Sequence, residues 1–402
     1  MRKAVAVILS AACISLCACT AVTTDTQEEQ ASSSEPSSVA TPESSEYTIT
    51  PAYIIPTAGD GDMQYNLYRD CKPAEDVFAI EEIGLPQTVA DSPILPVMLL
   101  DENSALIYMY KAGTNGALQE ENLEAIGCYN IETGECEKWV SANSELDYTI
   151  QAINRRYLVY RESPIPYTEN FLKAENHQIA RLCVYDRDSQ ETYTVYEYPE
   201  EYIGSSIFYQ KGTALVENKL YFDTVCGSGS ESETIVYCAD LSTLDVIPYM
   251  EHAQCPMFDG KEIWCIAKQE NAYVLMSKES SEKIVLPDDV SEMAVGDSIF
   301  FKLNLGALAN NEFATWELVG AQSDEPVMTT QQMIDDLRLE EGCLVWTSYA
   351  DAPVFLFDTQ SDSFLCFDSL PEGTHYIRFF QGYGFLQLRT NGETHYYRLS
   401  KK

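Results

Sequence analysis

The sequence has few basic residues and few histidines. Its 402 residues include 63 Asp and Glu but only 25 Lys and Arg, so the formal net charge is -38 at pH 7. A charge of this sign repels phosphate backbones, and we expect no nucleic-acid partner. Only four histidines are available as metal ligands or as groups that titrate near neutrality. The sequence therefore predicts no metal site and no other cofactor.

The motifs of common catalytic sites are also missing. No G-x-S-x-G, H-E-x-x-H, P-loop, EF-hand loop or G-x-G-x-x-G occurs in the chain, which leaves no predicted catalytic residue. One local repeat relates Gly373–Arg378 to Gly392–Arg398 and places His375 and His395 20 residues apart. A pair of metal-binding histidines would explain this repeat, and so would similar strand sequences in one sheet.

Hydrophobic runs long enough to span a bilayer are absent. The N-terminal run Ala4–Leu16 has 13 residues, whereas a membrane-spanning helix needs about 20. Because the basic residues Arg2 and Lys3 precede this run, it predicts a secretory signal peptide.

The end of the apolar run contains a lipidation motif. The residues Leu16-Cys17-Ala18-Cys19 resemble the lipobox of bacterial lipoproteins, in which an aliphatic residue and then a small residue precede the modified cysteine. The resemblance implies that residues 1–18 are removed and that Cys19 carries the lipid. Cys17 departs from the usual pattern, because small or hydroxylated residues are commoner at its position. An ordinary signal peptide is the alternative.

Residues 19–50 are predicted to form a flexible stalk. From Thr20 to Glu46 the chain has no Lys, Arg or aromatic residue, six acidic residues, and a remainder rich in Ser, Thr, Pro and Gln. Such a segment buries too little apolar surface to offset its ordering entropy. A signal, a lipidated cysteine and a stalk together resemble surface lipoproteins of Gram-positive bacteria. This resemblance implies an extracytoplasmic protein anchored to the outer face of the cell membrane.

Residues 51–402 are predicted to form one all-β domain. No long segment with a 3.6-residue period follows Tyr47, whereas short runs of β-branched and aromatic residues alternate with Gly, Asn and Asp. An aliphatic residue followed by a bulky one recurs seven times, about 46 residues apart, which is the range of four-stranded propeller blades. The seven units are Ile107-Tyr108, Leu158-Val159-Tyr160, Leu220-Tyr221-Phe222, Ile263-Trp264, Ile299-Phe300-Phe301, Leu344-Val345-Trp346 and Phe385-Leu386.

The turns between strands point to the same fold. Segments such as Tyr129–Glu135 and Tyr185–Gln190 resemble the outer hairpins of TolB-like and WD-type β-propellers, where an Asn or Asp side chain caps the turn. We therefore expect a single β-propeller of seven four-stranded blades. Two or three β-sandwich domains are the alternative, although no Pro/Gly/Ser-rich linker interrupts residues 50–402.

The last blade is predicted to be completed from upstream. After the unit Phe385-Leu386 only three strands fit before Lys402, which would leave an unpaired edge. We predict that Val77–Ile80 pairs with the strand around Tyr396–Leu399 and closes the ring.

The ten cysteines after Cys19 contain no CxxC pair and no zinc-ligand spacing. Three pairs lie on predicted neighbouring strands, where disulfides would be within reach. These pairs are Cys128/Cys136, Cys226/Cys238 and Cys255/Cys265. Cys343 and Cys366 are predicted to lie two strands apart, beyond disulfide reach. The alternative is that most cysteines are small buried hydrophobic residues.

Three neighbouring blades contain long connections, which would emerge on one face of a propeller. The connections are Lys111–Glu124, Arg161–Gln178 and Gly227–Glu233. In the longest of them, Tyr167 and Phe171 stand beside two prolines that stiffen the loop, and we predict that both aromatic residues contact a ligand. Free variation of surface loops is the alternative.

These features predict a binding function. We expect a monomeric, membrane-tethered propeller that binds a protein, a peptide or a glycan without catalysis, and the net charge favours a neutral or cationic partner. An extracellular carbohydrate-active enzyme that uses the central mouth of the propeller is the alternative. Convergent carboxylates with aromatic neighbours at that mouth would favour the enzyme, and an apolar or plugged channel would favour the binding protein.

Overall fold

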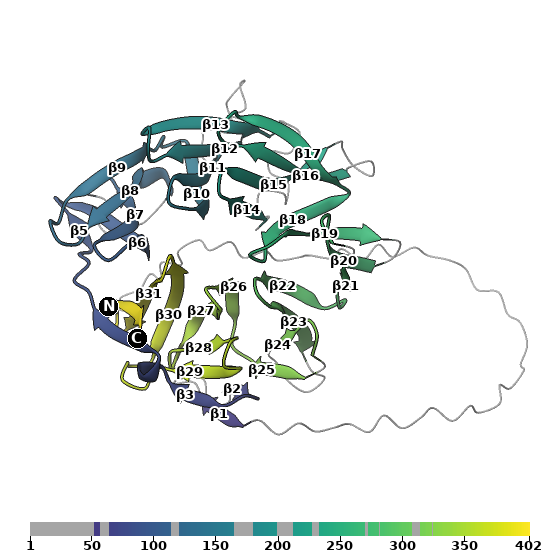
Figure 1. Ribbon diagram of the computed structural model, residues 1–402. Helices are drawn as coiled ribbons and strands as arrows, with labels where there is room; N and C mark the ends of the chain where they lie inside the picture. Colours follow the sequence, from purple (N-terminus) through teal and green to yellow (C-terminus); the bar gives the residue numbers. More distant parts are fainter. Residues whose placement is uncertain are drawn as a thin grey trace, which may run out of the picture. The chain divides into compact units, whose positions relative to one another are not determined.

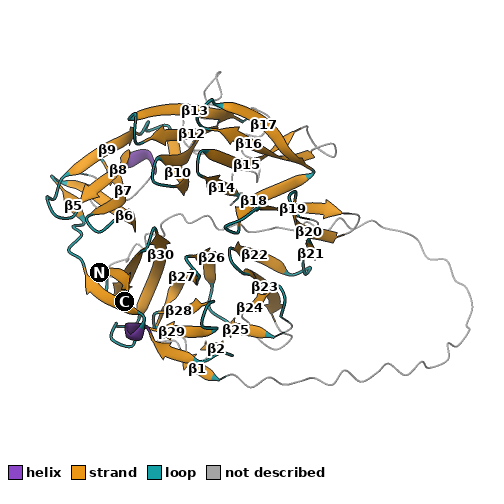
Figure 2. Cartoon of the chain, in the orientation of Figure 1, coloured by secondary structure: helices purple, strands orange, loops and turns teal. Residues whose placement is uncertain are grey.

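The computed structural model describes ten segments of the chain. These are residues 52–56, 64–113, 120–164, 180–198, 212–226, 233–269, 272–280, 282–307, 314–323 and 325–402. The chain divides into two units, Met1–Thr50 and Pro51–Lys402, and all described residues belong to the second unit. Strands dominate this unit, as Figure 2 shows.

Helix is almost absent from the described residues. Two 3-10 turns, η1 (Ala74–Asp76) and η2 (Glu120–Asn122), interrupt the strands. Nowhere in the described part of the chain is a helix long and apolar enough to cross a membrane.

Three sheets of four strands follow one another, and in each the strands pair antiparallel in chain order (Figure 1). The first sheet contains β10 (Leu146–Ile153), β11 (Tyr157–Pro164), β12 (Arg181–Asp186) and β13 (Glu191–Glu197). The second contains β14 (Thr213–Val216), β15 (Lys219–Cys226), β16 (Glu233–Asp240) and β17 (Asp245–Glu251). The third contains β18 (Ala253–Phe258), β19 (Ile263–Gln269), β20 (Ala272–Ser277) and β21 (Lys283–Val285).

Two further sheets have more than four strands. The five-stranded sheet contains β5 (Thr88–Val89), β6 (Ser92–Leu99), β7 (Ser104–Tyr110), β8 (Leu123–Asn130) and β9 (Cys136–Ser141). The six-stranded sheet contains β22 (Val290–Val295), β23 (Ile299–Ala307), β24 (Ala314–Gly320) and β25 (Pro326–Thr330), extended by β2 (Gln64–Leu67) and β1 (Tyr53–Pro56).

The last sheet has nine strands. They are β3 (Cys71–Pro73), β29 (Ser363–Cys366), β28 (Phe355–Asp358), β27 (Cys343–Ala352), β30 (Gly373–Phe380), β31 (Tyr383–Thr390), β32 (Glu393–Lys401) and β4 (Phe78–Glu82), with β26 (Ile334–Glu340) paired to β27.

The structure is a single β-propeller with five blades, and the prediction of seven blades is wrong. The five sheets of four to six strands are the blades. The strands predicted for the last two blades lie in the nine-stranded sheet, because β27 continues past Trp346 and pairs with β30 at Thr347↔Tyr376 and Ser348↔His375. Two units of the repeat are thereby joined in one sheet.

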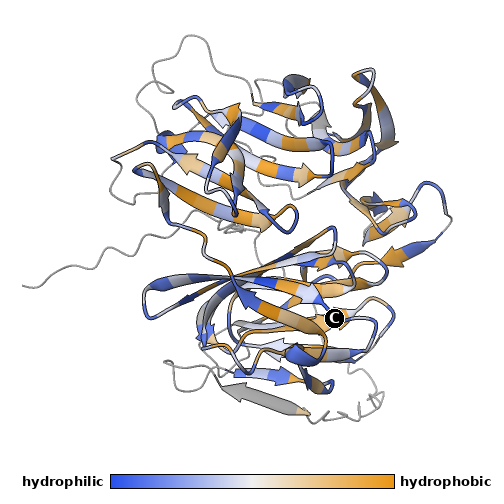
Figure 3. Ribbon diagram, turned by 60° about the vertical axis from the view of Figure 1, so that its left-hand side comes forward, coloured by the Kyte–Doolittle hydropathy of each residue, from blue (hydrophilic) through white to orange (hydrophobic). Residues whose placement is uncertain are grey.

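The prediction of a strand at each repeat unit is confirmed. All seven units lie in strands that pair with the next strand of the chain. Most of their apolar side chains are buried, and Leu158, Leu220, Leu344 and Phe385 are fully buried. Hydrophobic stretches lie along the strands, and hydrophilic ones are mainly at the connecting turns (Figure 3).

The hydrophobic core lies between neighbouring sheets. One cluster joins Val159 of the first four-stranded sheet to Leu220 and Phe222 of the second. Another joins Leu106 of the five-stranded sheet to Leu158 of the first four-stranded sheet. Because side chains alternate along a strand, one strand contributes to the core on both faces of its sheet.

The predicted pairing of the segment at Val77–Ile80 with the strand around Tyr396–Leu399 is confirmed, whereas the closure of a seven-bladed ring is not, because the structure has five blades. β4 pairs antiparallel with β32, with Ile80 opposite Leu399 and Ala79 opposite Ser400. Phe78 of β4 is buried and its ring packs 5.7 Å from that of Phe379. The edge left by β32 is therefore occupied by a segment that precedes β5 in the chain.

The segment before β4 adds three strands that the sequence did not predict. β2 pairs with β25, β1 pairs with β2, and β3 lies parallel to β29 (Figure 1). This segment thus covers the outer edges of the six-stranded and nine-stranded sheets.

One disulfide is present among the described residues, and it is not a predicted one. Cys71 of β3 bonds to Cys366 of β29, with their Cα atoms 6.3 Å apart. Cys128 and Cys136, one of the pairs for which a disulfide was within predicted reach, are not bonded, because Tyr129 opposes Cys136 and the two cysteines therefore point to opposite faces.

The other two possible bridges, Cys226/Cys238 and Cys255/Cys265, do not form either. Cys238, Cys255 and Cys265 are free thiols. A register shift in β18 displaces Cys255 from Cys265. The side chain of Cys226 lies outside what the structure describes.

Candidate functional site

The residues predicted from the sequence as lipidation and ligand sites are Cys19, Tyr167 and Phe171, and all three lie outside the described residues. The strands that lead into the long connections are described. β7 ends at Tyr110, β11 at Pro164 and β15 at Cys226. These strand ends are therefore the described residues that adjoin the long connections in the chain.

A group of ionisable side chains, here called the carboxylate cluster, lies near these strand ends. It consists of Tyr110, Glu120, Asp147, Arg161 and Asp223. Arg161 precedes the end of β11 by three residues, and Asp223 precedes the end of β15 by three. Glu120 begins η2, which packs against β10 near Asp147. The cluster thus draws residues from three neighbouring blades.

Asp147 is at the centre of the interactions within the cluster. Burial raises the pKa of Asp147, while the hydroxyl of Thr149, which donates at 3.2 Å, and the charge of Arg161 lower it. Burial together with the charge of Asp147 raises the pKa of Tyr110 to about 12. Burial and the same charge raise the pKa of Glu120. Protons are therefore held more tightly here than on exposed carboxyls.

Asp223 is the most deeply buried carboxyl of the cluster. Asp223 is 5% exposed. Burial raises the pKa of its carboxyl to about 6, although a backbone hydrogen bond and the charge of Arg161 lower it. The amide of Cys255 donates to Asp223 Oδ2 at 2.6 Å. Cys255 adopts a left-handed conformation with φ 52°, which is strained for a non-glycine residue.

The cluster can bind a polar ligand through several kinds of hydrogen bond. The carboxyls accept or donate according to their protonation, a guanidinium only donates, and a phenol does both. Asp223 can also exchange a proton close to neutral pH. In the described part of the chain no group of three or more His, Cys, Asp or Glu side chains is arranged to hold a metal ion.

Sequence reasoning identified the connections but missed the carboxylates. Asp223 stands inside the apolar run Leu220–Thr224, and Asp147 stands between Leu146 and Tyr148. An acidic residue inside a strand of bulky apolar residues is costly to bury without a function or a partner. This pattern in the sequence could have identified Asp147 and Asp223 as candidate site residues.

The walls at the centre of the propeller are formed by the first strands of the sheets, which contact one another, as β10 does with β14 and β14 with β18. Beside β22, the buried Lys302 amine lies 2.9 Å from Glu292 Oε2 and donates to the Ile334 carbonyl at 2.7 Å. The same amine lies 4.7 Å from the Trp316 ring centroid. This buried charge is therefore neutralised locally.

A second charged group lies on β26 and β30. Arg338 and Arg378 both donate to the Tyr376 hydroxyl, at 3.3 and 2.9 Å. Arg378 pairs with Glu340 at 2.7 Å, and Arg338 pairs with Asp336. Both of these carboxylates are therefore paired with cations.

The two histidines of the local repeat do not meet. His375 opposes Leu388, and Leu388 opposes His395, so one strand separates them. The separation is about 10 Å, too far for one metal ion. His375 is buried, whereas His395 Nδ1 lies 2.9 Å from Glu82. Similarity of strands in one sheet therefore explains the repeat.

No family model and no curated protein matches the sequence. Among solved structures, the β-propeller domain of the Trilobed protease from Pyrococcus furiosus is 10% identical, with 78% of this chain and 96% of that chain covered and a TM-score of 0.47. Oligogalacturonate lyase from Vibrio parahaemolyticus is 10% identical, with 87% and 96% covered and a TM-score of 0.41.

TolB from Acinetobacter baumannii is 12% identical, with 77% of this chain and 80% of that chain covered and a TM-score of 0.35. These likenesses concern the fold alone. No residue, activity or substrate of these proteins is transferred to this chain, whose assignment as a β-propeller rests on its own sheets.

Proposed function

We propose that this chain is a lipoprotein, anchored through Cys19 to the outer face of the cell membrane, whose β-propeller binds a protein, peptide or glycan without transforming it. The basic N-terminus, the short apolar run and the lipobox-like residues support the anchor. Replacing Cys19 with Ala is expected to block processing or to release the protein from membranes, as fractionation and N-terminal sequencing would show. A wild-type protein found soluble, with an N-terminus beyond Thr20, would contradict the anchor.

The carboxylate cluster is the observation that supports the binding function. It gathers ionisable side chains of three blades at the strand ends that lead into the three long connections. Because the chain has a net charge of -38, a neutral or cationic ligand approaches it more easily than an anion.

The experiment is a glycan array and a peptide array probed with the detergent-solubilised full chain and with two variants. Asp147→Asn removes one charge from the cluster, and its expected effect is a loss of about tenfold in ligand affinity. Asp288→Asn removes an exposed charge outside the cluster and serves as the matched control. Equal affinity of both variants for every captured ligand would show that the cluster is not the binding site.

A carbohydrate-active enzyme is the second candidate, and the elevated pKa of Asp223 favours it, because a carboxyl that stays protonated near neutrality can act as a general acid. Incubation with bacterial and plant polysaccharides, followed by analysis of reducing ends, distinguishes the two functions. Products that disappear with Asp223→Asn would replace the binding function by the enzymatic one.

A further inference from the structure

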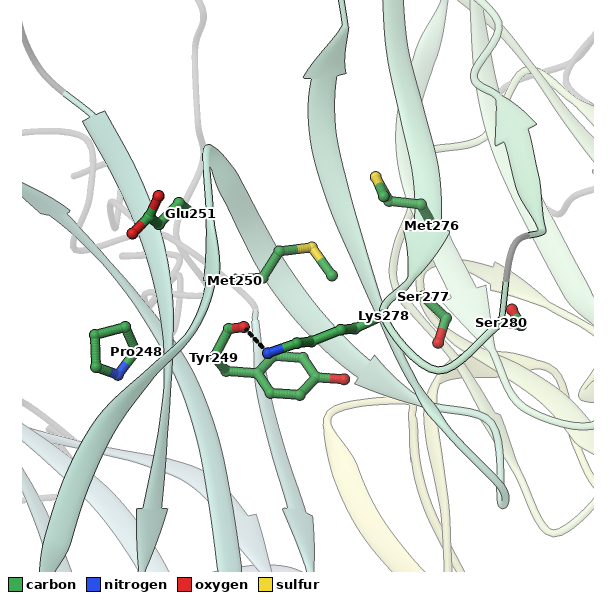
Figure 4. A pocket seen from close by; sticks show the side chains of 8 residues that line it. All are labelled: Pro248, Tyr249, Met250, Glu251, Met276, Ser277, Lys278 and Ser280. Atoms are coloured by element: carbon green, nitrogen blue, oxygen red, sulfur yellow. Dashed lines mark hydrogen bonds between the residues drawn. The ribbon is translucent and has the colours of Figure 1, made fainter.

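A groove of about 570 Å³ lies between β17 and β20, on the second and third four-stranded sheets. Its lining consists of Pro248, Tyr249, Met250, Glu251, Met276, Ser277, Lys278 and Ser280. Figure 4 shows that the side chains of Met250 and Met276 extend from the two sides toward the space between them. This groove involves none of the residues of the carboxylate cluster.

The floor of the groove is apolar and is fixed in place. The Lys278 amine donates to the Tyr249 carbonyl at 2.9 Å and lies 5.0 Å from the Tyr249 ring centroid (Figure 4). The aliphatic part of the Lys278 side chain therefore stays across the groove while its amine is hydrogen-bonded. Two flexible methionine side chains above this floor can adapt to the shape of an inserted apolar group.

Two glutamates, Glu262 and Glu279, lie beside the groove and bond to its lining residues Ser277 and Tyr249. The Ser277 hydroxyl lies 2.5 Å from Glu262 Oε2 and 2.9 Å from Glu279 Oε2, and the Tyr249 hydroxyl donates to Glu279 Oε1 at 2.6 Å. The single hydroxyl hydrogen of Ser277 can be donated to only one of the two carboxylates. Neither glutamate has a basic partner among the described residues, so a cationic group from outside would be stabilised there.

Exposed hydrophobic residues are concentrated around the same two sheets. Four of the seven large hydrophobic residues that are exposed in the described part of the chain stand on or beside β17, β20 and β21. They are Leu244 at 41%, Ile247 at 61%, Tyr273 at 49% and Val285 at 66% exposure. Single exposed apolar residues are common on any protein, and none of these four lines the groove itself.

We propose that this groove docks a basic peptide segment of another protein, which inserts one apolar side chain between Met250 and Met276 and places a Lys or Arg against Glu262 and Glu279. The charge of the groove selects a basic segment over an acidic one. Pro248 and a register shift interrupt the outer strand β17, which disfavours the addition of a peptide as a further strand. Recognition is therefore through side chains.

The test uses the detergent-solubilised full chain to select binders from a phage library of random 12-residue peptides. The expected result is enrichment of peptides that contain several Lys or Arg residues and one large apolar residue. A selected peptide is then synthesised with a fluorophore, and its Kd is measured by anisotropy against the wild type, Glu279→Gln and Met250→Gln. Each variant is expected to weaken binding about tenfold.

Glu372→Gln is the matched control, because Glu372 is exposed, immediately precedes β30 and does not line the groove. It is expected to leave the Kd unchanged, and melting temperatures of all variants verify that they fold. Selection of acidic peptides, or of none, would overturn the inference. So would sedimentation data showing that the chain forms a dimer that Met250→Gln dissociates, because the occupant would then be a second copy.

The variants Asp147→Asn and Glu279→Gln together distinguish peptide binding in the groove from binding at the carboxylate cluster. Binding of the selected peptide that is lost with Asp147→Asn but kept with Glu279→Gln would place the peptide at the carboxylate cluster. That result would overturn the groove as a docking site and support the cluster as the binding site.

Discussion

At the scale of single residues, the most unusual environment among the histidines is that of His375. Its side chain is buried on β30, and Nδ1 lies 3.3 Å from the Gly373 carbonyl, while Nε2 has no hydrogen-bond partner among the described residues. Burial lowers the pKa of His375 to about 4, from an ordinary value of 6.5. The folded protein therefore requires the neutral imidazole.

We predict that His375 makes the folded state sensitive to mild acid. Between pH 4 and 6.5 the unfolded chain binds a proton that the folded chain does not, so stability falls as the pH decreases through this window. The shift corresponds to about 3 kcal/mol in the free energy of unfolding. Urea unfolding of the wild type and of His375→Phe from pH 7.5 to 4.5 measures this difference.

Carboxyl groups also titrate in this pH range, but the wild type and His375→Phe have the same ones. The wild type is expected to lose stability more steeply than His375→Phe, and parallel pH profiles would refute the assignment. The sequence predicted only that His375 lies in a strand. Its burial depends on the pairing of β27 with β30, which nothing in the local sequence indicates.

At the scale of elements, β4 shows what a sequence can and cannot predict. The unpaired edge after β32 was predictable from the repeat, and so was the segment that fills it, because both follow from the alternation of apolar residues and from edge pairing. The pairing of β27 with β30, of β2 with β25 and of β3 with β29 was not predictable. No repeat unit and no predicted unpaired edge indicates these pairings, and their energies come from tertiary packing.

We predict that Phe78→Ala destabilises the whole second unit. Phe78 is 1% exposed, and its ring contacts Phe367 and Phe379 at centroid distances of 6.4 and 5.7 Å. Truncating a buried phenylalanine costs about 3 to 5 kcal/mol. Chemical unfolding followed by circular dichroism and by tryptophan fluorescence should show one earlier transition with both probes.

Lys72→Ala is the control for this prediction, because Lys72 is exposed in the preceding strand. An early transition seen by one probe only would mean that β4 detaches without affecting the rest of the propeller.

At the scale of the whole molecule, the disulfide between Cys71 and Cys366 connects residues 295 positions apart. The sequence could not identify this pair, because the two cysteines become neighbours only when β3 lies beside β29. Cross-linking such distant residues restricts the unfolded chain strongly. In the chain-entropy account a loop of this length corresponds to about 6 kcal/mol, whereas disulfides typically contribute about 2 to 4 kcal/mol to stability.

We predict that the Cys71→Ser/Cys366→Ser double variant melts well below the wild type under oxidising conditions. The wild type treated with a reductant is expected to melt like the double variant. Cys343→Ser is the control, since Cys343 is a buried free thiol that the bridge does not involve. Identical melting of oxidised wild type and double variant would show that the bridge adds no stability.

The same disulfide determines how the propeller would respond to mechanical load. A pull on the chain from the N-terminal side of β1 acts first on β1 and β2, which are held by backbone pairing, and then on Cys71, which is held covalently. β4 follows Cys71 in the chain, so tension is diverted into β29 before it reaches the pairing of β4 with β32. The disulfide therefore bears the force. β1 and β2 can separate from their sheet and pair again while β4 carries no load.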